Sequence, residues 1–336
     1  MTRLTNCILN KDPSCVPVWF MRQAGRYLPE FREIRSKNKD FIKLCLNSNL
    51  SSIITLQPLK RFNLDAAIIF SDILMTPYAL GQKVVFVKDA GPSLSPFNLN
   101  FFLENEESLF TKKLNPIYDS IKITRKNLDK NKSLISFIGA PWTLAVYMFG
   151  LKADKDRINL EKLKKHESEI TMVLEKIIDY LCAHIIKQVQ AGADVVQIFD
   201  SWAGLIPEEK LFDYCYEPNK KIVNFCKKNN IPVICFPRGI KKNYIKFAET
   251  VNPNCLSLDY EVDPMWAKEN LNKFCLQGGM DPKILFKKED EIFKAVDNYL
   301  NIFKDHPYIF NLGHGLLPET NPDILQKVVE RVNNFK

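Results

Sequence analysis

The chain has 336 residues, of which 46% are hydrophobic and 26% charged, a composition typical of a globular protein that buries a sizeable core. No run of eighteen apolar residues occurs, so we expect no membrane-spanning segment. The formal net charge of +8 suggests nucleic acid as a possible partner, but the lysines are scattered and no RNP, KH or zinc-knuckle pattern accompanies them. We therefore expect no nucleic-acid partner; a positive balance also suits a small polyanionic substrate.

The nine cysteines indicate a reducing compartment. Their number is odd, they form no CxxC pair, and several stand in apolar runs, where cysteine behaves as a small hydrophobic residue. The polar start of the chain, residues 1–6, lacks the apolar core of a signal peptide. We therefore expect free thiols and a cytoplasmic location.

The first predicted strand, residues 17–21, runs into a polar loop that contains two arginines. Arg22 and Arg26 are four residues apart with a glycine between them, and such guanidiniums can converge on one anion, each offering a planar fork to a carboxylate. Pro29 suits the first turn of a helix, and Arg35, about two turns further on, could reach the same point. The alternative is a surface loop whose arginines are simply solvated.

Seven further short apolar runs follow, and each ends in turn-forming or polar residues. These predicted strands are 66–70, 134–138, 195–199, 232–236, 255–258, 274–277 and 308–312. Amphipathic helices are predicted at 114–128, 161–191, 208–228, 240–250, 264–271, 290–303 and 322–335. Val84–Val87 and the turn at Gly91 and Pro92 indicate a hairpin-like excursion after the second strand.

Eight strands that alternate with helices predict parallel βα units, and eight is the number that closes a (β/α)8 TIM barrel. The competing fold is a doubly wound open sheet, which usually has an early glycine-rich nucleotide turn. Neither GxGxxG nor GxxxxGK[ST] occurs here. No linker or internal repeat divides the chain, so we expect an α/β, single-domain (β/α)8 barrel over residues 1–336.

Active sites of βα barrels lie at the carboxyl ends of the strands. The side chains predicted at these ends are Arg22, Arg26, Asp72, Tyr147, Ser201, Arg238 and His314. Such a set suits a site that binds several carboxylates and handles protons. Metal-ligand spacings such as HxH or CxxC are absent, so we expect no metal. Neither a GxSxG elbow nor a Cys/His pairing indicates a covalent nucleophile.

Three of these side chains also have ordinary structural interpretations. Asp72 could cap the next helix, although the nearby Pro77 argues against a simple helix start. His314 stands between two glycines at a strand end, where ligands bind, but a lone histidine is often structural. Tyr147 lies in a helix-like segment and is as consistent with the core as with a ligand contact.

Several blocks of the sequence resemble the uroporphyrinogen decarboxylase family. They are MRQAGRYLPEFREIR at 21–35, IIFSD at 68–72, GAPWTL at 139–144, FDS at 199–201, GGMDP at 278–282 and NLGHG at 311–315, in the family's own order. The resemblance extends from about residue 6 to residue 335. It implies a (β/α)8 barrel, a homodimer and no cofactor. It also implies stepwise loss of CO2 from the four acetate side chains of uroporphyrinogen III, which gives coproporphyrinogen III.

The resemblance also implies roles for individual residues. Carried over by motif position, the substrate-binding residues are Arg22, Gln23, Ala24, Gly25, Arg26, Arg35, Asp72, Tyr147, Ser201 and His314. Asp72 and Arg22 would be the catalytic residues. Asp200 and Arg238 stand where relatives often have glutamate and lysine, and both keep the charge.

Two other functions fit parts of the pattern. Zinc-dependent methyltransferases of the same superfamily need a His-x-Cys and a distant cysteine at strand ends, which this sequence lacks. A non-catalytic tetrapyrrole carrier would keep the arginines but would not need Asp72.

Overall fold

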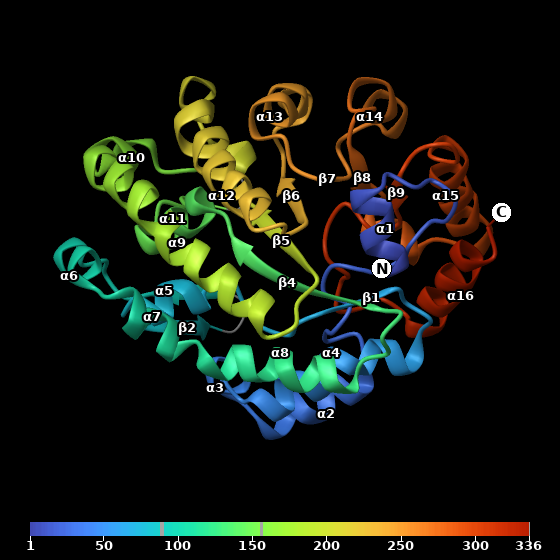
Figure 1. Cartoon of the computed structure of the whole chain (residues 1–336), viewed down its shortest axis with the longest axis horizontal. Coiled ribbons are helices and arrows are strands. Elements are labelled where there is room, and N and C mark those ends of the chain that lie inside the picture. The colour runs from blue at the N-terminus through green and yellow to red at the C-terminus, as the bar shows by residue number, and fades with distance from the viewer. Residues whose placement is uncertain (88–90, 155–156, 336) are drawn as a thin grey trace.

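The computed structural model describes residues 1–87, 91–154 and 157–335. Its centre is a curled sheet of seven parallel strands in the order β1-β4-β5-β6-β7-β8-β9 (Figure 1). The strands are β1 (Ala66–Ile68), β4 (Ser133–Gly139), β5 (Val195–Asp200), β6 (Val233–Pro237), β7 (Cys255–Leu258), β8 (Cys275–Gly278) and β9 (Tyr308–Ile309). Seven of the eight predicted strands are thus confirmed, with shifted ends.

Helices surround the outer face of this sheet, except for the first, which lies at the amino ends of the strands (Figure 1). They are α1 (Arg3–Leu9), α2 (Pro29–Lys37), α3 (Phe41–Cys45), α4 (Ser48–Arg61), α5 (Met75–Ala79), α6 (Leu99–Glu104), α7 (Glu107–Lys113), α8 (Asn115–Asn127), α9 (Pro141–Met148), α10 (Leu160–Lys165), α11 (Glu167–Gln190), α12 (Glu217–Lys228), α13 (Tyr244–Val251), α14 (Pro264–Asn270), α15 (Glu289–Ile302) and α16 (Pro322–Asn333). None in the described ranges is long and apolar enough to cross a bilayer.

Two predicted helices differ from the structure. The helix expected at 161–191 divides at His166 into α10 and α11. The helix expected at 208–228 instead starts with a 3-10 turn, Glu208–Lys210, and a π-helical turn, Phe212–Tyr216, before α12. Pro218 has no N–H to donate to the preceding turn, which gives a physical reason for the interrupted hydrogen-bond ladder.

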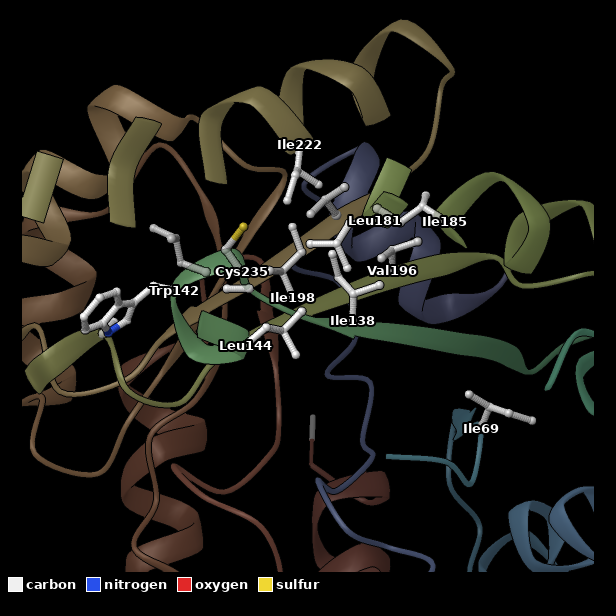
Figure 2. Close-up of a cluster of buried hydrophobic side chains, with 14 of the residues drawn as sticks. Ile69, Ile138, Trp142, Leu144, Leu181, Ile185, Val196, Ile198, Ile222 and Cys235 are labelled. Atoms are coloured by element: carbon white, nitrogen blue, oxygen red, sulfur yellow. The ribbon is translucent and has the colours of Figure 1, made fainter. Parts of the chain in front are cut away.

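Alternate strand residues face two separate cores. On the outer side, Ile138 of β4 and Ile198 of β5 pack beneath helices α11 and α12 (Figure 2). On the inner side, Ile135 and Ile309 belong to a smaller cluster that also contains Cys7 of α1. α1 lies at the amino ends of the strands, where Cys7 Sγ is 3.7 Å from Cys275 Sγ. All nine cysteines are free thiols, as predicted.

The closed eight-stranded barrel predicted from the sequence is only partly present. The segment expected as a first strand at 17–21 forms one isolated parallel bridge, between Val18 and Phe310. On both sides of this segment, side-chain oxygens accept N–H groups that the carbonyls of a neighbouring strand would accept in a regular sheet. Val18 N–H donates to Asp65 Oδ2 at 2.8 Å, and Met21 N–H donates to Asn311 Oδ1 at 3.1 Å. The result is a curled sheet of seven strands with a bridged segment between its ends.

The predicted excursion after the second strand is an antiparallel hairpin of β2 (Val84–Val87) and β3 (Gly91–Leu94). Gly91 and Pro92, expected in the turn, belong to β3, where Pro92 pairs with Phe86. Residues 88–90, which connect the two strands, lie outside the described part of the chain.

Candidate active site

The predicted site residues follow the carboxyl ends of their strands. Ser201 comes directly after β5, and Arg238 comes directly after β6. Asp72 and His314 follow β1 and β9 within loops, and Tyr147 lies near the end of α9, the helix that follows β4. The sheet curls, so these loops approach one another at a single edge of the fold.

The loop that presents Arg22 is held in place by buried hydrogen bonds. Gln23 is fully buried: its Oε1 accepts the Phe20 N–H at 3.0 Å, and its Nε2 donates to the Ala66 carbonyl at 3.0 Å. The Tyr27 hydroxyl donates to the Gln23 carbonyl at 2.8 Å. Position 25 requires glycine, because a Cβ there would lie 2.8 Å from the Arg22 carbonyl oxygen. Gln23 therefore braces the loop, and direct contact with a substrate stays a prediction.

Arg22 adopts a left-handed backbone conformation, with φ of 62°, which is uncommon for a residue other than glycine and asparagine. Such strain persists where the surrounding structure enforces it, and it clusters at functional sites. The Arg22 side chain passes over Gly315, where a Cβ would come within 2.6 Å of Arg22 Cγ. The Leu316 N–H donates to the Met21 carbonyl at 2.9 Å and holds the two loops together.

The Arg22 guanidinium has no ion pair or side-chain hydrogen bond within the described residues. Burial lowers its pKa from the ordinary value; the charges of Asp72 and Tyr147 oppose this shift, and those of Arg26 and Arg238 add to it. The residue as a whole is nevertheless exposed, so an anion can reach the guanidinium from solution. It is therefore a ready receptor for an anionic group.

Asp72 is half-buried, and burial raises the pKa of its carboxyl to about 6, although the Leu74 N–H and the charge of Arg22 both oppose the shift. Its Oδ1 accepts that N–H at 2.9 Å. The N-cap of α5 is Leu74, so Asp72 is not the helix cap considered above. Oδ2 has no hydrogen-bond donor among the described residues and is free to bind a ligand.

Tyr147 and His314 are uncharged at neutral pH. Burial raises the pKa of Tyr147, and Asp72 adds to the effect, while Trp202 and Arg22 oppose it. Burial, together with the charges of Arg22 and Arg238, lowers the pKa of His314 to about 4. Both side chains are half-buried. They can therefore hydrogen-bond to a ligand without adding charge to the site.

The remaining predicted residues lie around this group. Ala24 and Gly25 are half-buried in the arginine loop, and Ser201 is half-buried in the turn after β5. Arg26 is exposed, and its charge reaches Arg22. Arg35 is not brought into direct contact with the others: its Nη1 donates to the Asn38 carbonyl, and its guanidinium lies 5.7 Å from the centre of the Phe41 ring.

Sequence reasoning missed the residues that hold the loops in place. Asn311 Oδ1 accepts the backbone N–H groups of both Met21 and Leu312, which joins the arginine loop to the histidine loop. Asp200 accepts the Thr143 hydroxyl at 2.7 Å and so joins β5 to α9. Asn311 lies in the NLGHG block, but nothing in the block shows that its side chain points inward. Only the alternation of strand residues could have indicated it.

Neither a metal cluster nor a separate ligand site stands out. Within residues 1–87, 91–154 and 157–335, no three His, Cys, Asp or Glu side chains are grouped as for a metal ion. A surface hollow between α15 and α16 is lined by Glu289, Phe293, Asp297, Lys327 and Arg331. Two ion pairs take up most of its charges, Lys327 with Glu289 and Arg331 with Asp297, each at 2.6 Å.

Comparisons with known proteins agree with the sequence motifs. The family model described as uroporphyrinogen decarboxylase (URO-D) matches residues 1–335. A uroporphyrinogen decarboxylase of Jannaschia sp. is 39% identical, over 95% of this chain and 94% of its own. That of Rickettsia felis is 37% identical, over 98% of this chain and 96% of its own.

The solved structure of a methyltransferase from Methanosarcina mazei has a TM-score of 0.78 at 17% identity and covers 99% of this chain and 98% of its own. At this identity the likeness shows a shared fold and no more. The sequence relatives, however, are alike over almost their whole length, and the family model covers the same range. The chain therefore belongs to the uroporphyrinogen decarboxylase family.

Proposed function

We propose that this chain removes CO2 from the four acetate side chains of uroporphyrinogen III and releases coproporphyrinogen III. One observation carries the proposal: within a chain of this family, an unpaired Arg22 and a carboxylate with a free oxygen, Asp72, share one edge of the sheet. The arginine suits the substrate's carboxylates, and the aspartate suits its pyrrole N–H groups.

The chemistry needs an electron sink, because loss of CO2 from an acetate leaves a carbanion. A pyrrole ring protonated at its α-carbon is a cationic iminium, and it can take up that electron pair. Ionised Asp72 would accept hydrogen bonds from pyrrole N–H groups and stabilise the cationic ring. Its pKa of about 6 in the free protein leaves it mostly ionised at neutral pH, and a bound cationic ring would favour the ionised form further. The reaction would then need no cofactor.

Arg22 and Arg26 would hold carboxylates and so fix which ring lies over Asp72. Tyr147, Ser201 and His314 would add neutral hydrogen bonds to other carboxylates. The inner face of the sheet offers an apolar floor, since Phe137 and Phe199 are half-buried with ring centroids 5.7 Å apart. His314 is neutral at pH 7, so it is a poor choice for the proton donor, and so is an arginine with its high pKa.

The wider assignments are also proposals. We infer a single domain over residues 1–336, a homodimer and a cytoplasmic location, as the family resemblance implies. We also infer that residues 16–21 complete an eight-stranded barrel in the active protein. Supporting this, Phe310 N–H donates to the Pro17 carbonyl at 2.8 Å, and Asp65 N–H donates to the Val18 carbonyl at 2.9 Å.

The test is anaerobic turnover of uroporphyrinogen III by the purified chain, with products separated by their number of carboxylates. We expect intermediates that lose one carboxylate at a time and end at coproporphyrinogen III. Tight binding of uroporphyrinogen without any release of CO2 would contradict the proposal and favour the tetrapyrrole carrier. One tightly held zinc ion per chain, together with methyl transfer to a thiol, would instead favour the methyltransferase.

A further inference from the structure

Arg238 has the features of a substrate-binding residue, although neither the motif carry-over nor the family comparison assigns it that role. It stands directly after β6, the middle strand of the seven. Its side chain is half-buried and has no ion pair or hydrogen bond to any described residue. Surface arginines that lack partners are common, but a half-buried one at a strand end within this site needs an explanation.

The Arg238 backbone is fixed more firmly than a surface residue requires. Its N–H donates to the Asp200 carbonyl at 3.1 Å, and its carbonyl accepts the Gly204 N–H at 2.8 Å. The next residue, Gly239, donates its N–H to Asp259 Oδ2 at 2.7 Å. Gly204 and Gly239 touch so closely that a Cβ on Gly204 would lie 2.6 Å from the Gly239 carbonyl oxygen. A free guanidinium on such a fixed backbone is preorganised to bind an anion.

The charge of Arg238 acts on two residues of the predicted site. It lowers the pKa of His314, which follows the last strand, and that of Arg22, which follows the bridged segment between the sheet ends. β6 lies midway along the curled sheet, and Arg22 lies where its two ends approach each other. The two residues therefore follow elements on opposite sides of the curled sheet, and the charges of both act on His314.

We propose that Arg238 binds a substrate carboxylate on the side of the macrocycle opposite to the one held by Arg22. The inference rests on the proposed function, because a cyclic tetrapyrrole with carboxylates around its rim needs cations on opposite sides. Arg22 and Asp72 then act on one ring while Arg238 anchors the far ring. Arg238 thereby sets the position of the substrate and leaves the chemical step to Asp72.

The test compares Arg238→Gln with Arg238→Lys and with the control Lys242→Gln, which removes one positive charge from an exposed residue of the same loop. A hydrogen bond to a charged group contributes enough that we expect the KM for uroporphyrinogen III to rise roughly 10- to 100-fold in Arg238→Gln, with kcat close to wild type. Arg238→Lys keeps the charge but loses the planar fork, so its KM should lie between those of the wild type and Arg238→Gln. Lys242→Gln should match wild type.

An unchanged KM in Arg238→Gln, an equal rise in Lys242→Gln, or a loss confined to kcat would each overturn the proposal. Circular dichroism and the melting temperature check that each variant folds. If Arg238→Gln does not fold, Arg238→Lys decides: a raised KM supports the contact, and a wild-type KM refutes it. Failure of the wild type itself to release CO2 would count against the proposed function. An active wild type whose KM does not change when Arg238 is substituted would count only against this inference.

Discussion

An aspartate lies in the loop after β1 and another at the end of β5, and the two carboxyl groups have similar acidity in different surroundings. Burial raises the pKa of both Asp72 and Asp200 to about 6. Asp200 is 1% exposed and accepts hydrogen bonds from Thr143 and Asn219, at 2.7 and 3.2 Å, and from Cys215. Asp72 accepts one backbone N–H, keeps one oxygen free and feels the charge of Arg22.

The contrast shows that a raised pKa alone does not mark a reacting group. Desolvation acts on both carboxyls, but only Asp72 combines it with an unused oxygen, access from outside and nearby cations. The hydrogen-bonding capacity of Asp200 is taken up in joining β5, α9 and α12. We therefore assign chemistry to Asp72 and loop positioning to Asp200, and four experiments can break or sharpen this division.

The largest expected effect is that of Asp72→Asn. The amide keeps the size of the side chain and removes the charge that would stabilise the cationic ring. Loss of one preorganised electrostatic group typically costs about 10²- to 10³-fold in kcat. Anaerobic turnover should show this loss while uroporphyrinogen still binds. Rates equal to wild type would mean that the charge at this position is dispensable.

A smaller loss of activity is expected from Gly315→Ala, which changes the residue that the Arg22 side chain packs against. The added methyl group would overlap the Arg22 side chain, whose flexible end can move aside without unfolding the loop. A shifted guanidinium should lower kcat/KM by roughly 10- to 100-fold. In an Arg22→Ala background the same change should lower kcat/KM only slightly, because the side chain that it displaces is absent. Additive losses in the double variant would show that Gly315 acts through something else.

The sequence predicted most of the strand-end positions, because polar residues at the ends of apolar strands are easy to recognise. Asp72 and His314 follow their strands closely and were found that way. The bridged segment at 17–21 is predicted as a full strand because its composition is apolar. It falls short because Asp65 and Asn311 take its N–H groups with their side chains, which no local pattern reveals. Arg35 was placed at the site by motif position, yet its guanidinium binds a carbonyl near the end of its own helix.

The pH dependence of kcat/KM compares the two aspartates directly. If ionised Asp72 is required, activity rises with pH through its pKa of about 6 and falls about tenfold per pH unit below it. Asp200→Asn should keep this acidic limb, whereas the residual activity of Asp72→Asn should lack it. An acidic limb that survives in Asp72→Asn would assign the titration to another group or to the substrate.

Asp200→Asn should change kcat least and alter the pH dependence of stability instead. The folded-state pKa of Asp200, about 6, lies above the value of about 3.9 expected in the unfolded chain, so the fold favours the protonated form. The stabilising contribution is fully present below about pH 3.9 and is lost as the pH rises through about 6. Relative to Asp200→Asn, the wild type should therefore lose stability between pH 4 and pH 8, by roughly 3 kcal/mol at most.

Urea unfolding of both proteins across this pH range measures that difference, and comparison with the variant cancels the other carboxyl groups. Activity and stability would then change in opposite directions over the same window, the first through Asp72 and the second through Asp200. A difference that does not vary with pH would show that folded Asp200 stays ionised over this range, as it does in the unfolded chain. The hydrogen bonds from Thr143 and Asn219 would then outweigh its burial, and the distinction between the two aspartates would rest on access alone.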